Sequence, residues 1–106
     1  MSKNITYMKF KSLEDLVRLI VTSQRPLLFH STYGENKHVY YIYGTAGQKL
    51  IIYYVILDKP INKKYIHYNV LEGRISYGNE VNRDTRFVNI PVIEVDEENI
   101  TRELIE

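Results

Sequence analysis

The centre of the fold is encoded by HVYYIYGTAGQKLIIYYVIL, residues 38–57. Two runs rich in β-branched and aromatic residues, 38–43 and 49–57, flank a short loop that contains Gly44 and Gly47. This pattern is typical of a β-hairpin, because such side chains fit a pleated strand and glycine fits a tight turn. A phosphate-binding loop would need the spacing G-x-x-x-x-G-K-[ST] and a helix after it, and neither is present. The stretch therefore predicts two central strands of a tyrosine-rich antiparallel sheet.

The segment before this hairpin has the pattern of an amphipathic helix. Ser12 is a suitable N-cap, and Pro26 favours extended geometry in the residue before it. Apolar side chains recur at i, i+3, i+4, i+7 and i+8 along one stripe, at Leu13, Leu16, Val17, Ile20 and Val21. The sequence predicts a helix over about residues 12–24, packed on one face of the sheet.

Further strands are expected on both sides of these elements. Residues 5–10, 27–31, 65–71, 74–77 and 87–95 have β-rich composition, and Pro91 suggests a sheet edge or a bulge for the last. Asp96 can cap a short C-terminal helix with Ile100, Leu104 and Ile105 on one face. The chain is therefore predicted to be one α+β domain over residues 1–106. It should have a mainly antiparallel tyrosine-rich sheet, one amphipathic helix on one face and a short C-terminal helix.

The strand at residues 50–57 is apolar on both of its faces. An antiparallel strand usually has one buried face and one face in water. One face can receive the helix at 12–24, while the other needs the C-terminal helix, a second sheet layer or a second copy of the chain. A symmetric homodimer is the simplest of these remedies, because most soluble homo-oligomers close with two-fold symmetry.

Composition places the chain among ordinary globular domains. It has 106 residues, of which 44% are hydrophobic and 25% charged. The absence of cysteine excludes disulfides and thiolate chemistry and favours a cytoplasmic location. The N-terminus lacks the apolar run of a signal peptide, and no stretch is long enough to span a membrane, so no membrane association is expected. Ten tyrosines without tryptophan resemble the composition of proteins from heat-loving archaea and their viruses.

Charge is divided unequally along the chain. Residues 1–93 carry a net charge of +6 and residues 94–106 a net charge of −5, although the whole chain is only +1. A basic body with an acidic tail suggests an anionic partner and a tail that competes for the same surface. Removal of the tail is then expected to strengthen binding to that partner.

Chemical motifs for catalysis or metal binding are weak. His30, His38 and His67 lie on different predicted strands, without a cysteine or carboxylate at ligand spacing. Ser31 follows His30 directly, but neighbours along a strand point to opposite faces, so this pair cannot act as nucleophile and base. The sequence therefore predicts no enzyme, no cofactor and no metal site.

The tyrosines carry the main functional indication. Single-stranded nucleic acid binds where bases stack on aromatic side chains inside a basic groove, and basic residues flank the tyrosine-rich central strands here. We therefore expect a non-enzymatic binding module with nucleic acid as its leading ligand, either single-stranded or contacted through its backbone. The alternative is a homo-oligomeric or protein–protein interaction domain with a tyrosine-rich sheet interface. The predicted nucleic-acid-binding residues are Tyr41, Tyr43, Lys49, Tyr53, Lys63, Lys64, Arg74, Arg83 and Arg86.

Overall fold

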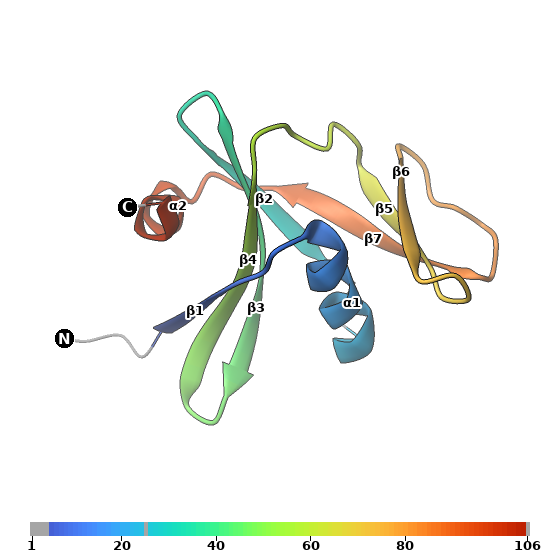
Figure 1. Cartoon of the computed structure of the whole chain (residues 1–106), viewed down its shortest axis with the longest axis horizontal. Helices are drawn as coiled ribbons and strands as arrows, with labels where there is room; N and C mark the ends of the chain where they lie inside the picture. Colours follow the sequence, from blue (N-terminus) through green and yellow to red (C-terminus); the bar gives the residue numbers. More distant parts are fainter. Residues whose placement is uncertain (1–4, 25, 106) are drawn as a thin grey trace.

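The structure of the chain is a computed structural model that describes residues 5–24 and 26–105. These described residues form seven strands and two helices (Figure 1). Their bounds are β1 (Ile5–Lys9), α1 (Leu13–Ser23), β2 (Leu28–Tyr33), β3 (Lys37–Ala46), β4 (Lys49–Leu57), β5 (Tyr65–Asn69), β6 (Arg74–Gly78), β7 (Phe87–Glu94) and α2 (Glu98–Ile105).

The strands form one mixed sheet in the order β1-β4-β3-β2-β7-β5-β6. The prediction of a mainly antiparallel sheet is wrong, because β1 pairs with β4 and β2 pairs with β7 in parallel. These parallel partners are separated by whole elements of the chain, and α1 carries the chain from β1 to β2. Alternation of side chains within a strand gives no information about such distant partners.

The last strand, β7, joins two parts of the sheet. Residues 87–91 pair antiparallel with β5, and residues 92–94 pair in parallel with β2. Pro91 therefore lies where one set of pairings ends and the other begins, a position that tolerates the missing backbone N–H. The sequence suggested a sheet edge or a bulge at this proline. As a whole β7 lies inside the sheet, between β2 and β5, but each half of the strand pairs with a neighbour on one side only.

Helix α1 lies within the curve of the sheet, between the central strands and the β5–β6 hairpin (Figure 1). Ser12 caps its N-terminus, where the side-chain oxygen accepts a hydrogen bond from the backbone N–H of Asp15 at 3.3 Å. Leu16, Val17 and Ile20 are completely buried. Around them lie buried residues of five strands, namely Leu28, Tyr40, Ile42, Val55, Ile66 and Ile90.

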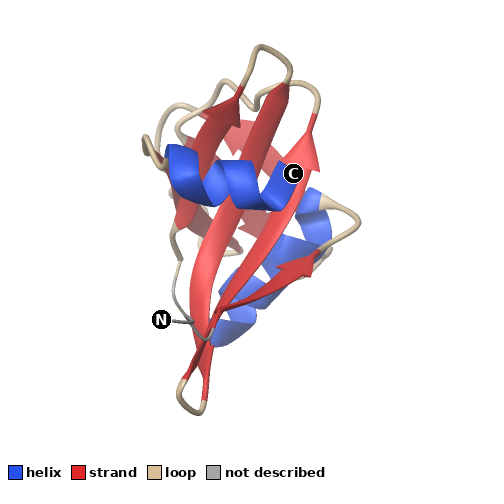
Figure 2. Ribbon diagram, turned by 90° about the vertical axis from the view of Figure 1, so that its left-hand side faces the viewer, coloured by secondary structure: helices blue, strands red, loops and turns tan. Residues whose placement is uncertain are grey.

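Helix α2 covers the opposite face of the sheet. Figure 2 shows it lying across strands whose other side carries α1. Side chains from both helix and strands make a second core, namely Val39, Tyr41, Ile52 and Tyr54 with Ile100, Leu104 and Ile105. The second apolar face at residues 50–57 is thus covered by the chain itself. Among the described residues, neither helix is long and apolar enough to cross a membrane.

A tight contact at the end of β6 gives a first prediction. A Cβ atom added at Gly78 would lie 2.5 Å from Nε2 of His67, a buried ring whose Nδ1 is 2.6 Å from Oδ1 of Asn89. Because this ring is held in place, Gly78→Ala should lower the free energy of unfolding by about 1–3 kcal/mol, as overpacking does. Urea unfolding measures the change. The exposed Ser76→Ala on the same strand should be neutral, and an equal midpoint for both variants would contradict the contact.

Candidate functional site

A cleft of about 460 Å³ opens where β2 and β7 run beside the loop that leads to β5. It lies on the same side of the sheet as α1. Its lining residue Tyr40 is one of the buried residues around α1, and His30 lies two residues after Leu28, hence on the same face of β2. The residues that line it are His30, Tyr40, Pro60, Asn62, Lys63, Lys64, Asn79, Val92 and Glu94. Most of these side chains are polar or charged, so the cleft suits a hydrophilic ligand.

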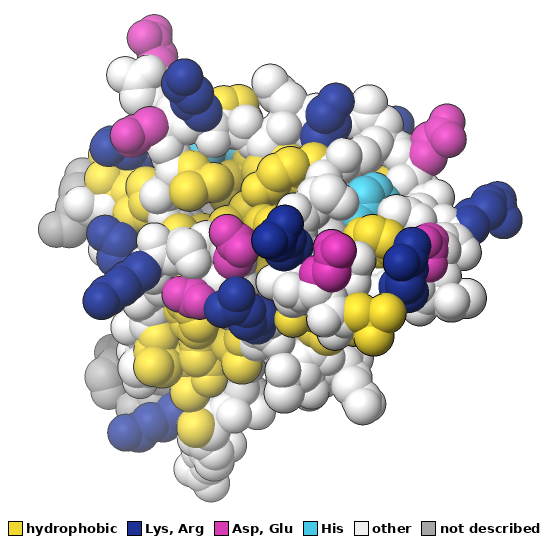
Figure 3. Space-filling view, turned by 45° about the vertical axis from the view of Figure 1, so that its right-hand side comes forward, with side chains coloured by type: hydrophobic (Ala, Val, Ile, Leu, Met, Phe, Trp, Pro, Cys, Tyr) yellow, Lys and Arg dark blue, Asp and Glu magenta, His cyan; other side chains and the backbone are white. Residues whose placement is uncertain are grey.

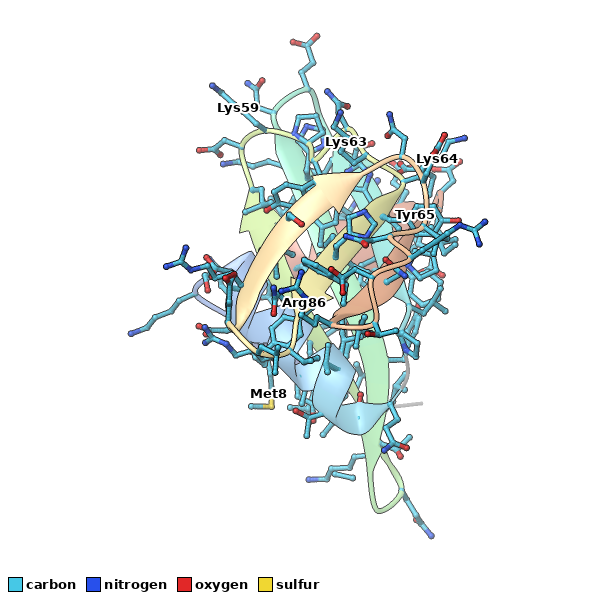
Figure 4. All side chains as sticks on the ribbon, turned by 90° about the vertical axis from the view of Figure 1, so that its right-hand side faces the viewer. Met8, Lys59, Lys63, Lys64, Tyr65 and Arg86 are labelled. Carbon is cyan, nitrogen blue, oxygen red and sulfur yellow. The ribbon has the colours of Figure 1, made fainter. Side chains whose placement is uncertain are left out.

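The loop that carries the two lysines is held at two points. The backbone N–H of Ile61 donates to the hydroxyl of Tyr40 at 2.8 Å, and the N–H of Val92 donates to the carbonyl of Lys64 at 2.8 Å. Asn62 adopts a left-handed conformation, with φ of 57°, that turns the chain between these points. The loop therefore presents its lysines from a fixed backbone. Figure 4 shows Lys59, Lys63 and Lys64 along one rim of the molecule.

His30 is the most constrained side chain of the cleft. Its Nδ1 lies 2.7 and 2.9 Å from the two carboxylate oxygens of Glu94, the residue paired with it across β2 and β7. Its Nε2 lies 3.1 Å from Nδ1 of His38 on β3. The ring stacks on Tyr40 with centroids 4.4 Å apart and 10° between the planes. Only 6% of His30 is exposed, so its ring is held in place, while the side chain of Glu94 that it contacts is largely exposed.

Two groups next to His30 have shifted pKa values. Burial lowers the pKa of His38, and the charge of His30 lowers it further, while Glu94 acts in the opposite direction. Burial raises the pKa of Tyr40, opposed by the hydrogen bond from Ile61. Tyr40 therefore stays a neutral phenol that supports both the loop and the histidine.

The two lysines of the cleft are available to a ligand. Within residues 5–24 and 26–105, the ion pairs of basic residues engage Arg18, His30, Lys37, Arg86 and Arg102, but neither Lys63 nor Lys64. Figure 3 shows Lys and Arg interleaved with Asp and Glu across one side of the molecule. What marks the cleft is that two adjacent lysines without an ion pair among the described residues line the same concave site.

Two of the predicted tyrosines belong to the second core. Tyr41 is completely buried and Tyr43 is half-buried, and both hydroxyls donate to Oε2 of Glu97, at 2.5 and 2.7 Å. Burial and this carboxylate raise the pKa of Tyr41, and they raise that of Tyr43 to about 12. Tyr7 similarly donates to Glu103. These tyrosines hold α2 on the sheet, and Tyr41 offers no ring face for stacking while α2 covers it.

The other predicted residues are dispersed. Tyr53 lies on the α1 side, edge-on to Phe10 with ring centroids 5.9 Å apart. Lys49 begins β4 beside the hairpin turn, Arg74 begins β6, and Arg83 is exposed in the loop before β7. Arg86 pairs with Asp84 at 2.7 Å, which lowers the pKa of that carboxyl to about 2. Of the nine predicted residues, Lys63 and Lys64 are the two that line the cleft.

Sequence reasoning did not find the partners of His30. Glu94 is 64 positions away, and no motif connects it with the two histidines. The prediction that His30 and Ser31 face opposite sides is confirmed, because Ser31 contacts Thr101 of α2 at 2.8 Å between the two hydroxyl oxygens. In the described part of the chain, no group of three His, Cys, Asp or Glu residues is placed to hold a metal ion. No protein-family model, curated protein or solved structure matches the chain, so its own geometry is the basis for a functional proposal.

Proposed function

We propose that this chain is a binding module, not an enzyme, and that its cleft binds the phosphate backbone of nucleic acid. The observation that carries this proposal is the pair Lys63 and Lys64, free of ion pairs among the described residues and presented by a loop fixed at both ends. Lysine ammonium groups bind phosphates as point charges, and each neutralised phosphate releases counterions.

Neutral donors complement the two cations. Asn62 and Asn79 line the same cleft, and their side-chain amides can donate hydrogen bonds to phosphate or sugar oxygens. Such contacts fix the register of a nucleic acid on a protein without reading its sequence. The lining therefore favours a phosphodiester chain over an apolar ligand of similar size.

Contact through the backbone is favoured over base stacking. The tyrosines expected to form a stacking platform pack beneath α2 or on the α1 side of the sheet, and Tyr41 is completely buried. Because these predicted tyrosines do not form an exposed platform, the affinity should depend on phosphate contacts and hence steeply on salt. We therefore propose binding with little preference for base sequence.

The double substitution Lys63→Gln/Lys64→Gln tests the site. It removes two phosphate contacts, so affinity for a single-stranded oligonucleotide should fall at least about tenfold at low salt, and the slope of log K against log salt should decrease by about 1.4, at about 0.7 per contact. Fluorescence anisotropy at several salt concentrations measures both. Lys9→Gln/Lys49→Gln, which also removes two positive charges but from residues outside the cleft, is the control and should leave the slope nearly unchanged.

Equal losses in the variant and the control would mean that only net charge matters and would refute the cleft. The alternative proposal, self-association through the tyrosine-rich sheet, has lost its original motive, because α2 covers the face that seemed to need a partner. A homodimer remains testable by sedimentation at micromolar concentration. A dimer whose formation is unaffected by the lysine substitutions, together with no oligonucleotide binding, would favour that alternative.

A further inference from the structure

We infer that the cleft binds its phosphate ligand together with one proton, which is held by the hydrogen-bonded chain Glu94–His30–His38. This inference rests on the proposed function and adds its regulation by pH. The three side chains come from β7, β2 and β3, and they are joined by contacts of 2.7 and 3.1 Å. His30 lines the cleft and His38 stacks on it with ring centroids 5.2 Å apart, so a charge on His38 acts on the ligand from one ring behind the lining.

The order of partners determines where the hydrogens are. A carboxylate only accepts hydrogen bonds, so Nδ1 of His30 must carry a hydrogen and donate it to Glu94. Nε2 of a neutral His30 is then an acceptor, and Nδ1 of His38 must donate to it. What remains is Nε2 of His38, a half-exposed residue, and in this arrangement that nitrogen has an unprotonated lone pair. Within the described residues no hydrogen bond occupies this atom.

This arrangement accepts one proton without losing a contact. A proton on Nε2 of His38 leaves both existing hydrogen bonds in place, and its positive charge is stabilised along the chain toward Glu94. A second proton would convert Nε2 of His30 into a donor facing the donor on His38, which would break the contact between the rings. The chain therefore takes up one proton before it is disrupted.

The charges around the chain determine the sign of the effect. From the loop before β5, Lys63 and Lys64 contribute two positive charges, and from β7 Glu94 contributes one negative charge, so the unprotonated cleft has a net charge of +1. Lys37, next to His38, is offset by Asp58 at 3.3 Å, and Tyr40 is neutral. Uptake of one proton adds a positive charge one ring behind the lining, so binding should be tighter at low pH.

Linkage gives the pH range. Burial lowers the pKa of His38 below its ordinary value of 6.5 when the cleft is empty. A bound phosphate next to the chain favours the charged form and raises that pKa. Between the pKa of His38 in the empty cleft and its pKa in the occupied cleft, binding takes up a proton and the dissociation constant rises with pH. Above both pKa values His38 is neutral with or without ligand, and its contribution to the affinity is lost.

The test uses oligothymidylate with hydroxyl groups at both ends, because neither its bases nor its phosphodiesters titrate between pH 5.5 and 8. Affinity for the wild-type chain should be about fivefold to tenfold higher at pH 5.5 than at pH 8. Calorimetry in two buffers of different ionisation enthalpy should show net proton uptake near pH 6. His38→Gln, which removes the acceptor at a half-exposed position, should abolish the pH dependence, whereas His67→Gln on β5 should retain it.

The outcomes separate this inference from the proposed function. Binding that requires Lys63 and Lys64 but has the same affinity at both pH values would overturn the proton linkage and leave the proposed function standing. A pH dependence that persists in His38→Gln would also overturn it. If the wild-type chain binds at neither pH value, the proposed function is refuted, and the inference with it. Circular dichroism shows whether each variant is folded. If a variant does not fold, NMR titration of the histidine ring protons in the wild-type chain, with and without the oligonucleotide, measures the proton uptake directly.

Discussion

A chain that ends at residue 95 is expected to lose most of its stability and to self-associate. Such a truncation removes α2 and exposes the second core, of which Tyr41 and Ile52 are completely buried. Burial of each large apolar side chain contributes about 1.5–3 kcal/mol, and proteins of this size are stable by about 5–15 kcal/mol in total. Urea unfolding and sedimentation measure the two effects. A truncated chain that stays monomeric with an unchanged midpoint would show that α2 does not cover the sheet.

A full-length variant separates the apolar cover from the acidic charges. Glu97→Gln/Glu103→Gln keeps the side chains of the second core and weakens the hydrogen bonds from the tyrosines, so each substitution should destabilise the chain by only about 1 kcal/mol. The sequence suggested that the acidic tail competes for a basic surface, but these two carboxylates are engaged by tyrosine hydroxyls. Competition by the acidic tail is therefore tested with this folded variant and not with the truncated chain. Stronger oligonucleotide binding by the variant would show that the tail competes.

The substitution Leu16→Ala is expected to lower the free energy of unfolding by about 2–5 kcal/mol. Leu16 is completely buried at the centre of α1, where the sheet curves around the helix, so truncation leaves a cavity that rigid neighbours cannot fill. The urea midpoint measures this loss. Arg18→Ala, on the exposed face of the same helix, should change it by less than about 0.5 kcal/mol. Similar midpoints for the two variants would contradict the packing of α1.

Local patterns predicted the elements better than their arrangement. The spacing of Leu13, Leu16, Val17 and Ile20 coincides with the buried face of α1, because a helix repeats every 3.6 residues whatever it packs against. The strand partners were less predictable. The parallel pairings of β1 with β4 and of β2 with β7 depend on contacts between distant segments, and alternation within a strand does not encode them.

The same limit explains the candidate site. Lys63 and Lys64 were found because adjacent lysines in a turn are visible in the sequence, whereas the pairing of His30 with Glu94 requires β7 to lie beside β2. The tyrosines were misleading for a related reason. A half-buried phenol suits a ligand platform and an internal contact equally well, and the position of Glu97 over Tyr41 depends on where α2 docks.

The double role of β7 has a consequence for how the chain folds. Its junction with β2 closes a loop of about sixty residues, and topologies dominated by such distant pairings fold slowly, because the entropy of loop closure is lost before the contacts form. The β3–β4 and β5–β6 hairpins are local and can form earlier. Until β7 docks, β2 presents an unpaired edge that can pair with another molecule. The slow step is therefore also the step most exposed to aggregation, and the cleft does not exist before it is complete.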